Sequence, residues 1–342
     1  MINIDGSTGE GGGQVLRTCL SLSLITGQSF QITNIRKGRK SPGLKAQHLK
    51  AVEVAAKVGK ATVYGVDPNS TIVTFSPKTI QPGHIKCKIG TAGSTSLVLQ
   101  TIILPLSMGN TASSISITGG THVPWAPSFD FLKYHWMQYL IKLGIDISLD
   151  MDMAGFYPQG GGRIHATVRP TDSILPLNLT HRGALKQIRG LSAVANLDRR
   201  IAERQRAQIL RRLSDSYPLN DIRIVQLPSR YKGTTVCLIC EFEHSQCCYF
   251  ALGELGKPAE RVSDEVVEKI LFFLSTNATV DEYLADQILL PLTLAKSRST
   301  FSTSKITKHL LTNVEIIQKF IPVSISISGE INSPGMITVD PG

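Results

Sequence analysis

Apolar and polar positions along the chain repeat one order of elements three times. In the first segment they predict a helix over 14–26, a strand over 29–35, a helix over 44–58 and strands over 61–64 and 71–75. The second segment begins at IGTAGSTSLVLQTIILPLSMG and the third at VDEYLADQILLPLTLA. In both, an apolar helix precedes an alternating strand, a second helix and a second strand. One such unit cannot bury its sheet face alone, so we predict that three units pack together.

Residues 185–278 have a different character and separate the second segment from the third. They predict a strand, a helix, three strands and a helix, with an apolar set of their own. This stretch is near the size of a small domain. We therefore predict a large domain of residues 1–182 and 279–342 and an inserted domain of residues 183–278. The fold class is α/β (α+β), with repeated helix–sheet units and a smaller inserted α/β domain.

Composition adds few constraints. The chain has 342 residues, 42% hydrophobic and 18% charged, as in an ordinary globular protein. Its longest apolar window, 96–106, contains Gln100 and Pro105 and is too short to span a bilayer. The N-terminus MINID lacks the basic and apolar regions of a signal peptide. We expect a cytoplasmic protein with no membrane partner.

The charge suggests a polyanionic partner, because the formal net charge is +10. One stretch concentrates it: IRKGRKSPGLK carries Arg36, Lys37, Arg39, Lys40 and Lys45 and no acid. A second set of arginines lies on the predicted helix 199–214. Such runs are more typical of a solvated helix face, and nucleic-acid contact is the alternative there.

The cysteines resemble a zinc motif at first sight. Cys237 and Cys240 form CLIC, with His244, Cys247 and Cys248 nearby. However, VCLICEFE reads as a strand, in which residues three apart point to opposite faces. Such residues cannot share one ion, so we predict buried, inert cysteines.

A glycine-rich stretch, STGEGGGQVLRT, precedes the first helix. Glycines before a helix allow the backbone to approach a phosphate, with free helix N–H groups aimed at it. The Lys-Ser/Thr ending of a P-loop is missing, however. Glu10 lies inside the loop and Arg17 is the first cation. The stretch predicts an anion site and leaves open why it contains a carboxylate.

Two further residues are candidates for a functional site. His309 lies in TKHLLTN, directly before an apolar helix, although a lone histidine is more often structural. Asp286 lies in YLADQ, at the start of the preceding helix. A carboxylate facing a core is costly unless paired, which makes Asp286 a site candidate. The alternative is an acid that favours the first turn of its helix.

Several long motifs, in order, resemble the RNA 3′-terminal phosphate cyclase family. They are STGEGGGQVLR, IRKGRKSPGLKAQHLKAV, GSTSLVLQTIILP, GFYPQGGG, EYLADQILLP and HLLTN. The resemblance runs nearly end to end and includes the insertion. It implies repeats packed as in enolpyruvyl transferases, with a repeat unit similar to the C-terminal domain of translation initiation factor three. It also implies a thioredoxin-like inserted domain without redox function.

The resemblance implies an ATP-dependent reaction on RNA that ends in a 3′-terminal phosphate. His309 matches the family nucleophile, which takes AMP from ATP and passes it to the RNA phosphate. The neighbouring 2′-hydroxyl then displaces AMP and forms a 2′,3′-cyclic phosphate. A divalent cation, Mg²⁺ or Mn²⁺, accompanies ATP, and Glu10 matches a metal-associated carboxylate.

Further site residues follow from the same resemblance. The positions that match RNA-phosphate contacts are Arg17, Arg36, Arg39 and Gln47. The positions that match the ATP site are Gln100, Pro127, Phe131, Tyr283, Leu284, Ala285, Asp286 and Gln287. Tyr283 would stack on adenine with Pro127 on the opposite face, and the alternative for Tyr283 is a plain core aromatic. Asp286 and Gln287 would hydrogen-bond the ribose or base.

Three positions depart from the family pattern. Ala154 stands before GFYPQGGG where Arg or His is usual, and GGTHVPWAPSFDF has His122 and Trp125 where Asp or Asn and a smaller residue are expected. A non-catalytic cyclase-like protein of ribosome assembly is the rival reading, and that branch lacks the histidine. An enolpyruvyl transferase is the second rival. A homodimer is compatible with the sequence, which does not determine the oligomeric state.

Overall fold

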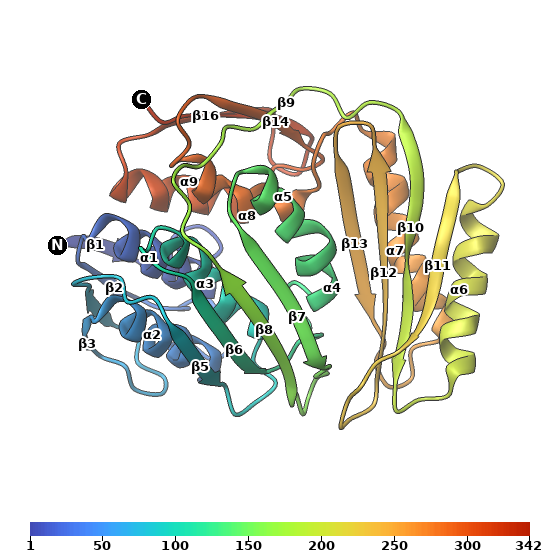
Figure 1. Cartoon of the computed structure of the whole chain (residues 1–342), viewed down its shortest axis with the longest axis horizontal. Coiled ribbons are helices and arrows are strands. Elements are labelled where there is room, and N and C mark those ends of the chain that lie inside the picture. The colour runs from blue at the N-terminus through green and yellow to red at the C-terminus, as the bar shows by residue number, and fades with distance from the viewer.

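The computed structural model describes all 342 residues and contains the three predicted units (Figure 1). Each unit runs strand, helix, strand, helix, strand, strand. The first unit comprises β1 (Ile2–Asp5), α1 (Gly13–Thr26), β2 (Phe30–Thr33), α2 (Ala46–Gly59), β3 (Thr62–Tyr64) and β4 (Val73–Ser76). The second comprises β5 (His84–Lys88), α3 (Thr95–Ser107), β6 (Ser113–Gly119), α4 (Phe129–Phe131), η1 (Leu132–Trp136), α5 (Met137–Lys142), β7 (Ile147–Met153) and β8 (Gly162–Val168). The third comprises β9 (Asn178–Leu179), α8 (Glu282–Leu292), β14 (Ser299–Thr303), α9 (Lys308–Phe320), β15 (Ser324–Ser328) and β16 (Gly335–Asp340).

The three sheets have the same topology. Their strand orders are β1-β2-β4-β3, β5-β6-β8-β7 and β9-β14-β16-β15. In each, the first two strands pair in parallel and the other pairings are antiparallel. This identity confirms the repeated helix–sheet fold. It also adds a first strand to every unit, which the sequence pattern did not reveal because β1 and β9 are too short to show an alternation.

The units share one core. Helix α1 packs against α2, α3 and α9, and α8 packs against α9. A single hydrophobic cluster of 65 buried residues runs through all three units and includes Leu20, Ile102 and Ile288. Each sheet therefore packs mainly on the helices of its own unit, and the helices pack against those of neighbouring units, so that the three units bury their apolar faces together. No helix is long and apolar enough to cross a membrane.

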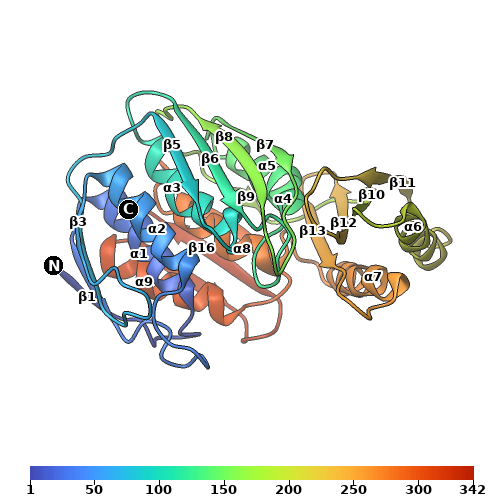
Figure 2. The ribbon, with the colours of Figure 1, turned by 90° about the horizontal axis from the view of Figure 1, so that it is seen from below.

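The inserted segment forms a fourth sheet, at one end of the molecule (Figures 1 and 2). Its elements are β10 (Leu185–Ala195), α6 (Arg199–Leu213), β11 (Leu219–Gln226), β12 (Gly233–Phe242), β13 (Gln246–Leu252) and α7 (Ala259–Ser275). The strand order is β11-β10-β12-β13, and α6 packs against α7. The segment interrupts the third unit after its first strand, because Leu179 of β9 pairs with Phe301 of β14.

Strand β12 confirms the prediction that the cysteines of CLIC are buried and point to opposite faces of a strand. Cys237 and Ile239 belong to the core shared with the repeats, whereas Leu238 and Cys240 belong to the core under α6 and α7. Cys237 and Cys240 thus point to opposite faces of the sheet. The Sγ atom of Cys237 lies 3.5 Å from that of Cys248, and all six cysteines are free and buried.

The insert docks on the second unit through a close contact at the start of β12. A Cβ atom added to Gly233 would lie 2.1 Å from Cγ of Phe156. We expect Gly233→Ala to lower the free energy of unfolding by about 1–3 kcal/mol, because the buried Phe156 ring must shift. Denaturant unfolding measures this change. Gly38→Ala is the control, since nothing lies within 4 Å of its added Cβ, and equal stability of both variants would contradict the contact.

Candidate active site

A cleft of about 2700 Å³ lies between the repeats and the insert. It brings together most of the residues that the sequence placed in the site. Those lining it are Glu10, Arg17, Arg36, Arg39, Gln47, Gln100, Pro127, Phe131, Tyr283, Asp286, Gln287 and His309. Leu284 and Ala285 are the exceptions, because their side chains are fully buried in the core on the other face of α8. Their side chains do not reach the cleft, and their place in the ATP site stays a prediction.

His309 is held by two neighbours from the first unit. The side-chain oxygen of Gln14 accepts a hydrogen bond from Nδ1, and Nε2 of Gln14 donates to the His309 carbonyl at 3.2 Å. The second bond fixes the orientation of the amide, so the proton of the ring lies on Nδ1. The other nitrogen, Nε2, lies 2.5 Å from Oε2 of Glu10.

The environment favours a neutral His309. Burial lowers the pKa of its imidazole, and the charges of Arg17 and Arg39 lower it further, against the opposing effect of Glu10. While Nε2 contacts Glu10 it carries a proton, because two acceptors cannot face each other at 2.5 Å. A ring that has lost this proton keeps the other on Nδ1 and has the Nε2 lone pair that a nucleophile needs. Glu10 contacts this nitrogen, so the carboxylate must turn away before Nε2 can attack.

Two glycines of the loop are required by neighbouring helices. Gly9 has φ +62°, and its added Cβ would lie 2.0 Å from Oγ1 of Thr312 on α9. An added Cβ on Gly13 would lie 2.2 Å from Nε2 of His48 on α2. Close packing of α9 and α2 therefore explains part of the glycine pattern. Gly12 caps α1 without a side-chain hydrogen bond, which leaves first-turn N–H groups for an anion.

Three arginines line the cleft beside the loop. The pKa of the half-buried Arg17 falls to about 10 through burial, so its guanidinium stays charged at neutral pH. Arg36 has φ +57° and donates to the carbonyls of Ser41 and Gly43 at 2.9 and 3.0 Å. Arg39 lies 3.9 Å from Glu10. Guanidinium groups in such an array suit phosphate oxygens.

Helix α8 supplies a carboxyl group that is neutral at pH 7. Burial raises the pKa of Asp286 to about 8, and Asp281 raises it as well, while Arg17 opposes the shift. The side chain can therefore donate a hydrogen bond at neutral pH. At the next residue of α8, Oε1 of Gln287 accepts a hydrogen bond of 2.6 Å from Nε2 of Gln100, which links α3 to α8.

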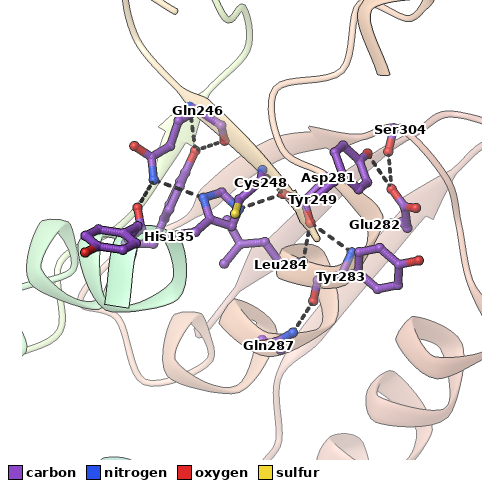
Figure 3. Close-up of polar contacts among 12 residues, drawn as sticks. His135, Gln246, Cys248, Tyr249, Asp281, Glu282, Tyr283, Leu284, Gln287 and Ser304 are labelled. Carbon is purple, nitrogen blue, oxygen red and sulfur yellow. Dashed lines mark hydrogen bonds and ion pairs between the residues drawn. The ribbon is translucent and has the colours of Figure 1, made fainter. Parts of the chain in front are cut away.

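A buried network fixes the N-terminus of α8 (Figure 3). One oxygen of Asp281 caps the helix by accepting from the N–H groups of Tyr283 and Leu284 at 3.1 and 2.9 Å. Its other oxygen lies 2.6 Å from Nε2 of His135. Nε2 of Gln246, on β13 of the insert, lies 3.0 Å from Nδ1 of His135. The first turn of α8 is thus held by both the second unit and the insert.

His135 reaches Asp281 from a π-helical turn. The second helix predicted for this segment is not regular throughout, because residues Leu132–Trp136 form the π-helix η1 between α4 and α5. The wider turn places the buried His135 toward α8. Single π turns inside α-helices are rare and occur frequently at functional sites.

Tyr283 presents its ring to the cleft. The residue is 41% exposed, which rules out the alternative of a plain core aromatic. Its ring lies edge-on to Tyr249 at 6.1 Å, and Nζ of Lys269 lies 5.6 Å from its centroid. Phe131, by contrast, is 1% exposed and belongs to the core behind the cleft, whereas Pro127 is half-buried.

Three residues of the site gave no sequence signal. Gln14 orients His309, His48 packs under Gly13, and Asn313 donates to the carbonyl of Asp286 at 3.0 Å. Burial and the nearby cations lower the pKa of His48 to about 3, so it stays neutral. Nothing in the sequence pattern indicates that α9 lies across from α1, which is the fact that gives these residues their role.

Two of the three residues that depart from the family pattern are buried and hydrogen-bonded within the fold. His122 is fully buried, with Nε2 3.0 Å from Asp130 and Nδ1 2.8 Å from Oγ1 of Thr121. Ala154 is fully buried, and its N–H donates to the carbonyl of Pro228 at 2.7 Å. A larger residue at 154 would separate the second unit from the insert. Trp125, the third departure, is fully exposed.

The residues present fit a divalent ion that arrives with a phosphate ligand. No group of three or more His, Cys, Asp or Glu side chains is arranged to hold a metal. Glu10 offers one carboxylate on the anion-binding loop. Mg²⁺ in such sites is held by one or two carboxylates plus phosphate oxygens and water.

Uncapped helix N–H groups and guanidinium groups line this cleft, and both are groups that suit phosphate oxygens. The chain belongs to the RNA 3′-terminal phosphate cyclase family, whose model matches residues 8–327. It is 39% identical to the RNA 3′-terminal phosphate cyclase of Gloeothece citriformis (strain PCC 7424), over 100% of this chain and 99% of that protein. It is 41% identical to the protein of the same name from Ralstonia nicotianae (strain ATCC BAA-1114 / GMI1000), over 96% of this chain and 94% of that protein.

The raised pKa of Asp286 predicts a stability effect that depends on pH. In the unfolded chain this carboxyl ionises near 3.8, whereas the folded protein keeps it protonated up to about 8. Between these values the unfolded state binds fewer protons, so this group makes the wild type less stable as the pH rises. Asp286→Asn should therefore raise the melting temperature, by an amount that grows from pH 4 to pH 8 and then levels off.

Calorimetry across this pH range tests the expectation. Asp67→Asn is the control, because Asp67 is exposed on a loop. A melting-temperature difference for Asp286→Asn that is constant with pH would show that Asp286 ionises normally.

Proposed function

We propose that the protein converts the 3′-terminal phosphate of RNA to a 2′,3′-cyclic phosphate at the expense of ATP. The observation that carries this proposal is the position of His309: an imidazole whose pKa is lowered by burial, with Nδ1 oriented by Gln14, lines the cleft beside a cationic anion site. The names of the relatives support the same reaction.

The reaction consists of three exchanges at phosphorus. Nε2 of His309 attacks the α-phosphorus of ATP, and the bond to the β-phosphate oxygen breaks to release pyrophosphate. An oxygen of the RNA 3′-phosphate then attacks the same phosphorus, breaks its bond to nitrogen and gives RNA-(3′)pp(5′)A. Finally the 2′-hydroxyl attacks the terminal RNA phosphorus, loses its proton to a base, and expels AMP. The imidazole regained in the second step is a base in place for that proton.

The charged groups suit these steps. Arg17, Arg36 and Arg39 would stabilise the negative charge that builds up on phosphate oxygens in each transition state. Gln47, whose side-chain oxygen accepts from the N–H of Ser94 at 3.0 Å, would add a polar contact in the same region. Glu10 would hold a divalent ion bound to ATP, Mg²⁺ or Mn²⁺, which supplies charge neutralisation when bound. Its move toward the ion would also free Nε2 of His309.

The nucleotide would lie along α8. The exposed ring of Tyr283 offers one face to adenine, and Pro127 lines the same cleft. Asp286, protonated at neutral pH, would donate to an oxygen or nitrogen of the ribose or base. Gln100 and Gln287, which bond to each other, provide further donors and acceptors.

The alternative function is that of a non-catalytic, cyclase-like protein that serves in ribosome assembly. Such a protein needs a binding surface but no oriented nucleophile. The paired contacts of His309 with Gln14 and Glu10 favour the enzyme, because they orient both ring nitrogens at the cleft, and Glu10 can release Nε2 by moving toward a bound ion.

Covalent labelling tests the nucleophile. Incubation with Mg²⁺ and ATP labelled at the α-phosphate should give a protein adduct that acid destroys and base preserves, as expected of a phosphoramidate. His309→Ala should abolish labelling and stay folded, whereas the exposed His181→Ala should label normally. Label retained in folded His309→Ala would eliminate the assignment.

Replacing Arg39 tests whether its guanidinium group acts in the RNA step or in the ATP step. If its guanidinium contacts the RNA phosphate, Arg39→Ala should reduce end-cyclisation by roughly tenfold or more, given about 1.5–3 kcal/mol for a hydrogen bond to a charged group, and reduce self-adenylylation far less. Lys40→Ala is the matched control, because Lys40 is exposed but does not line the cleft. Equal losses in both steps would place Arg39 at ATP instead.

A further inference from the structure

Three exposed aromatic side chains line the cleft without a role in the chemistry proposed above. Trp125 is 100% exposed, Tyr157 67% and Tyr231 40%. Large aromatic residues this exposed, gathered in one cleft, mark a surface that meets a ligand. Trp125 also has a left-handed backbone, φ +64°, which is uncommon for a bulky residue, and its side chain gains no packing in return.

The three loops that carry these residues are fastened to one another. His122 and Phe156 form a backbone bridge between the Trp125 and Tyr157 loops. Ala154 donates to the carbonyl of Pro228, which links the Tyr157 loop to the Tyr231 loop of the insert. The Tyr231 ring lies over Gly161, where an added Cβ would be 3.2 Å from Cε2. The aromatic residues therefore form one surface that spans the second unit and the insert.

Unpaired positive charge accompanies this surface. Arg230 and Lys232 flank Tyr231, line the cleft, are exposed and take part in no ion pair of the structure. On the neighbouring helix α6, by contrast, several arginines are neutralised by carboxylates, among them Arg204 by Glu260 at 2.8 Å and Arg212 by Asp264 at 2.7 Å. The two cations beside the aromatic rings are thus free to meet phosphates, as are Arg200, Arg206 and Arg211 on α6, which also take part in no ion pair.

The cleft is also larger than a nucleotide requires. Its volume of about 2700 Å³ exceeds the roughly 300–1,000 Å³ of ordinary small-molecule sites. ATP bound near His309 and Tyr283 leaves a large part of it open. Aromatic side chains together with positive charge in an open groove are the features by which proteins bind single-stranded nucleic acid without reading its sequence.

We propose that Trp125, Tyr157 and Tyr231, with Arg230 and Lys232, bind the single-stranded RNA on the 5′ side of the terminal phosphate. The bases stack on the aromatic rings, and the two cations contact the phosphates between them. This inference rests on the proposed function, since it assumes that an RNA end enters the cleft. It adds a binding surface for the body of the RNA, which the reaction itself does not need.

Tryptophan fluorescence offers a direct test, because the chain has two tryptophans and Trp136 is buried. A single-stranded RNA of about ten nucleotides with a 3′-phosphate, added without ATP, should quench Trp125 and protect it from acrylamide. A nucleoside 3′-phosphate should do neither. Trp125→Phe should lose the response to the RNA. An unchanged signal with the RNA, or an equal one with the monomer, would overturn the proposal.

Dependence on RNA length gives the second test. Tyr157→Ala and Tyr231→Ala should each lower kcat/KM for the ten-nucleotide RNA about fivefold or more, the value expected for loss of one base stack. The same variants should leave kcat/KM for a dinucleotide 3′-phosphate, and self-adenylylation, unchanged. Tyr157→Phe should behave as the wild type. Tyr64→Ala is the matched control, because Tyr64 is 68% exposed but lies on β3, far from the insert (Figure 1).

Salt dependence tests the two cations. Replacing Arg230 and Lys232 together by alanine should reduce the slope of log Kd against log salt for the ten-nucleotide RNA by about 1.4, since each phosphate contact on a single strand contributes about 0.7. An unchanged slope would refute the proposed binding surface. Equal losses of kcat/KM on the dinucleotide and on the longer RNA in the tyrosine variants would refute it as well. If the protein fails to cyclise RNA but RNA still quenches Trp125, the proposed function falls and the binding surface stands.

Discussion

The active site depends on the close packing of α1 against α9. Gly9 lets the loop before α1 approach Thr312 within a distance that no other residue allows, and Oγ1 of Thr18 donates to Oδ1 of Asn313 at 2.9 Å further along the helices. Because both helices begin at the same place, their N-termini meet. This packing of the first unit against the third puts His309 beside the anion-binding loop, although the two are almost the whole chain apart in sequence.

The same packing determines the charge of the site. Burial lowers the pKa of His309 and raises that of Asp286 to about 8, so Asp286 is protonated at pH 7, while Arg17 remains charged. Partial desolvation disfavours the charged forms of the nucleophile and of the acid of α8 but leaves the guanidinium groups charged. A polyphosphate therefore meets cations and helix N–H groups, with Glu10, which contacts Nε2 of His309, as the carboxylate that a divalent ion can take over.

Sequence patterns predicted the long, regular elements and missed what depends on neighbours. The helices of the repeats and the strands of the insert show strong periodicity, so their positions agree with the structure to within a few residues. Strands β1 and β9 have four and two residues, which is too short for a period, and the π turn at His135 has no pattern of its own. For the site, the residue patterns alone did not decide whether His309 and Asp286 have functional or structural roles. The family resemblance selected them, and Gln14 became visible only when α1 and α9 were placed together.

The position of the insert in the chain has a structural consequence. It follows β9 and leads directly into α8, so its last strand and helix come just before the helix that carries Tyr283. Gln246 of β13 contacts His135, and the hydroxyl of Tyr249 donates to Glu282 at 2.8 Å, an acceptor that Ser304 shares at 2.9 Å (Figure 3). These buried polar groups are satisfied only while the insert stays seated on the repeats. A shift of the insert would therefore break the hydrogen bonds at the first turn of α8, which makes it a structural part of the cleft rather than an appendage.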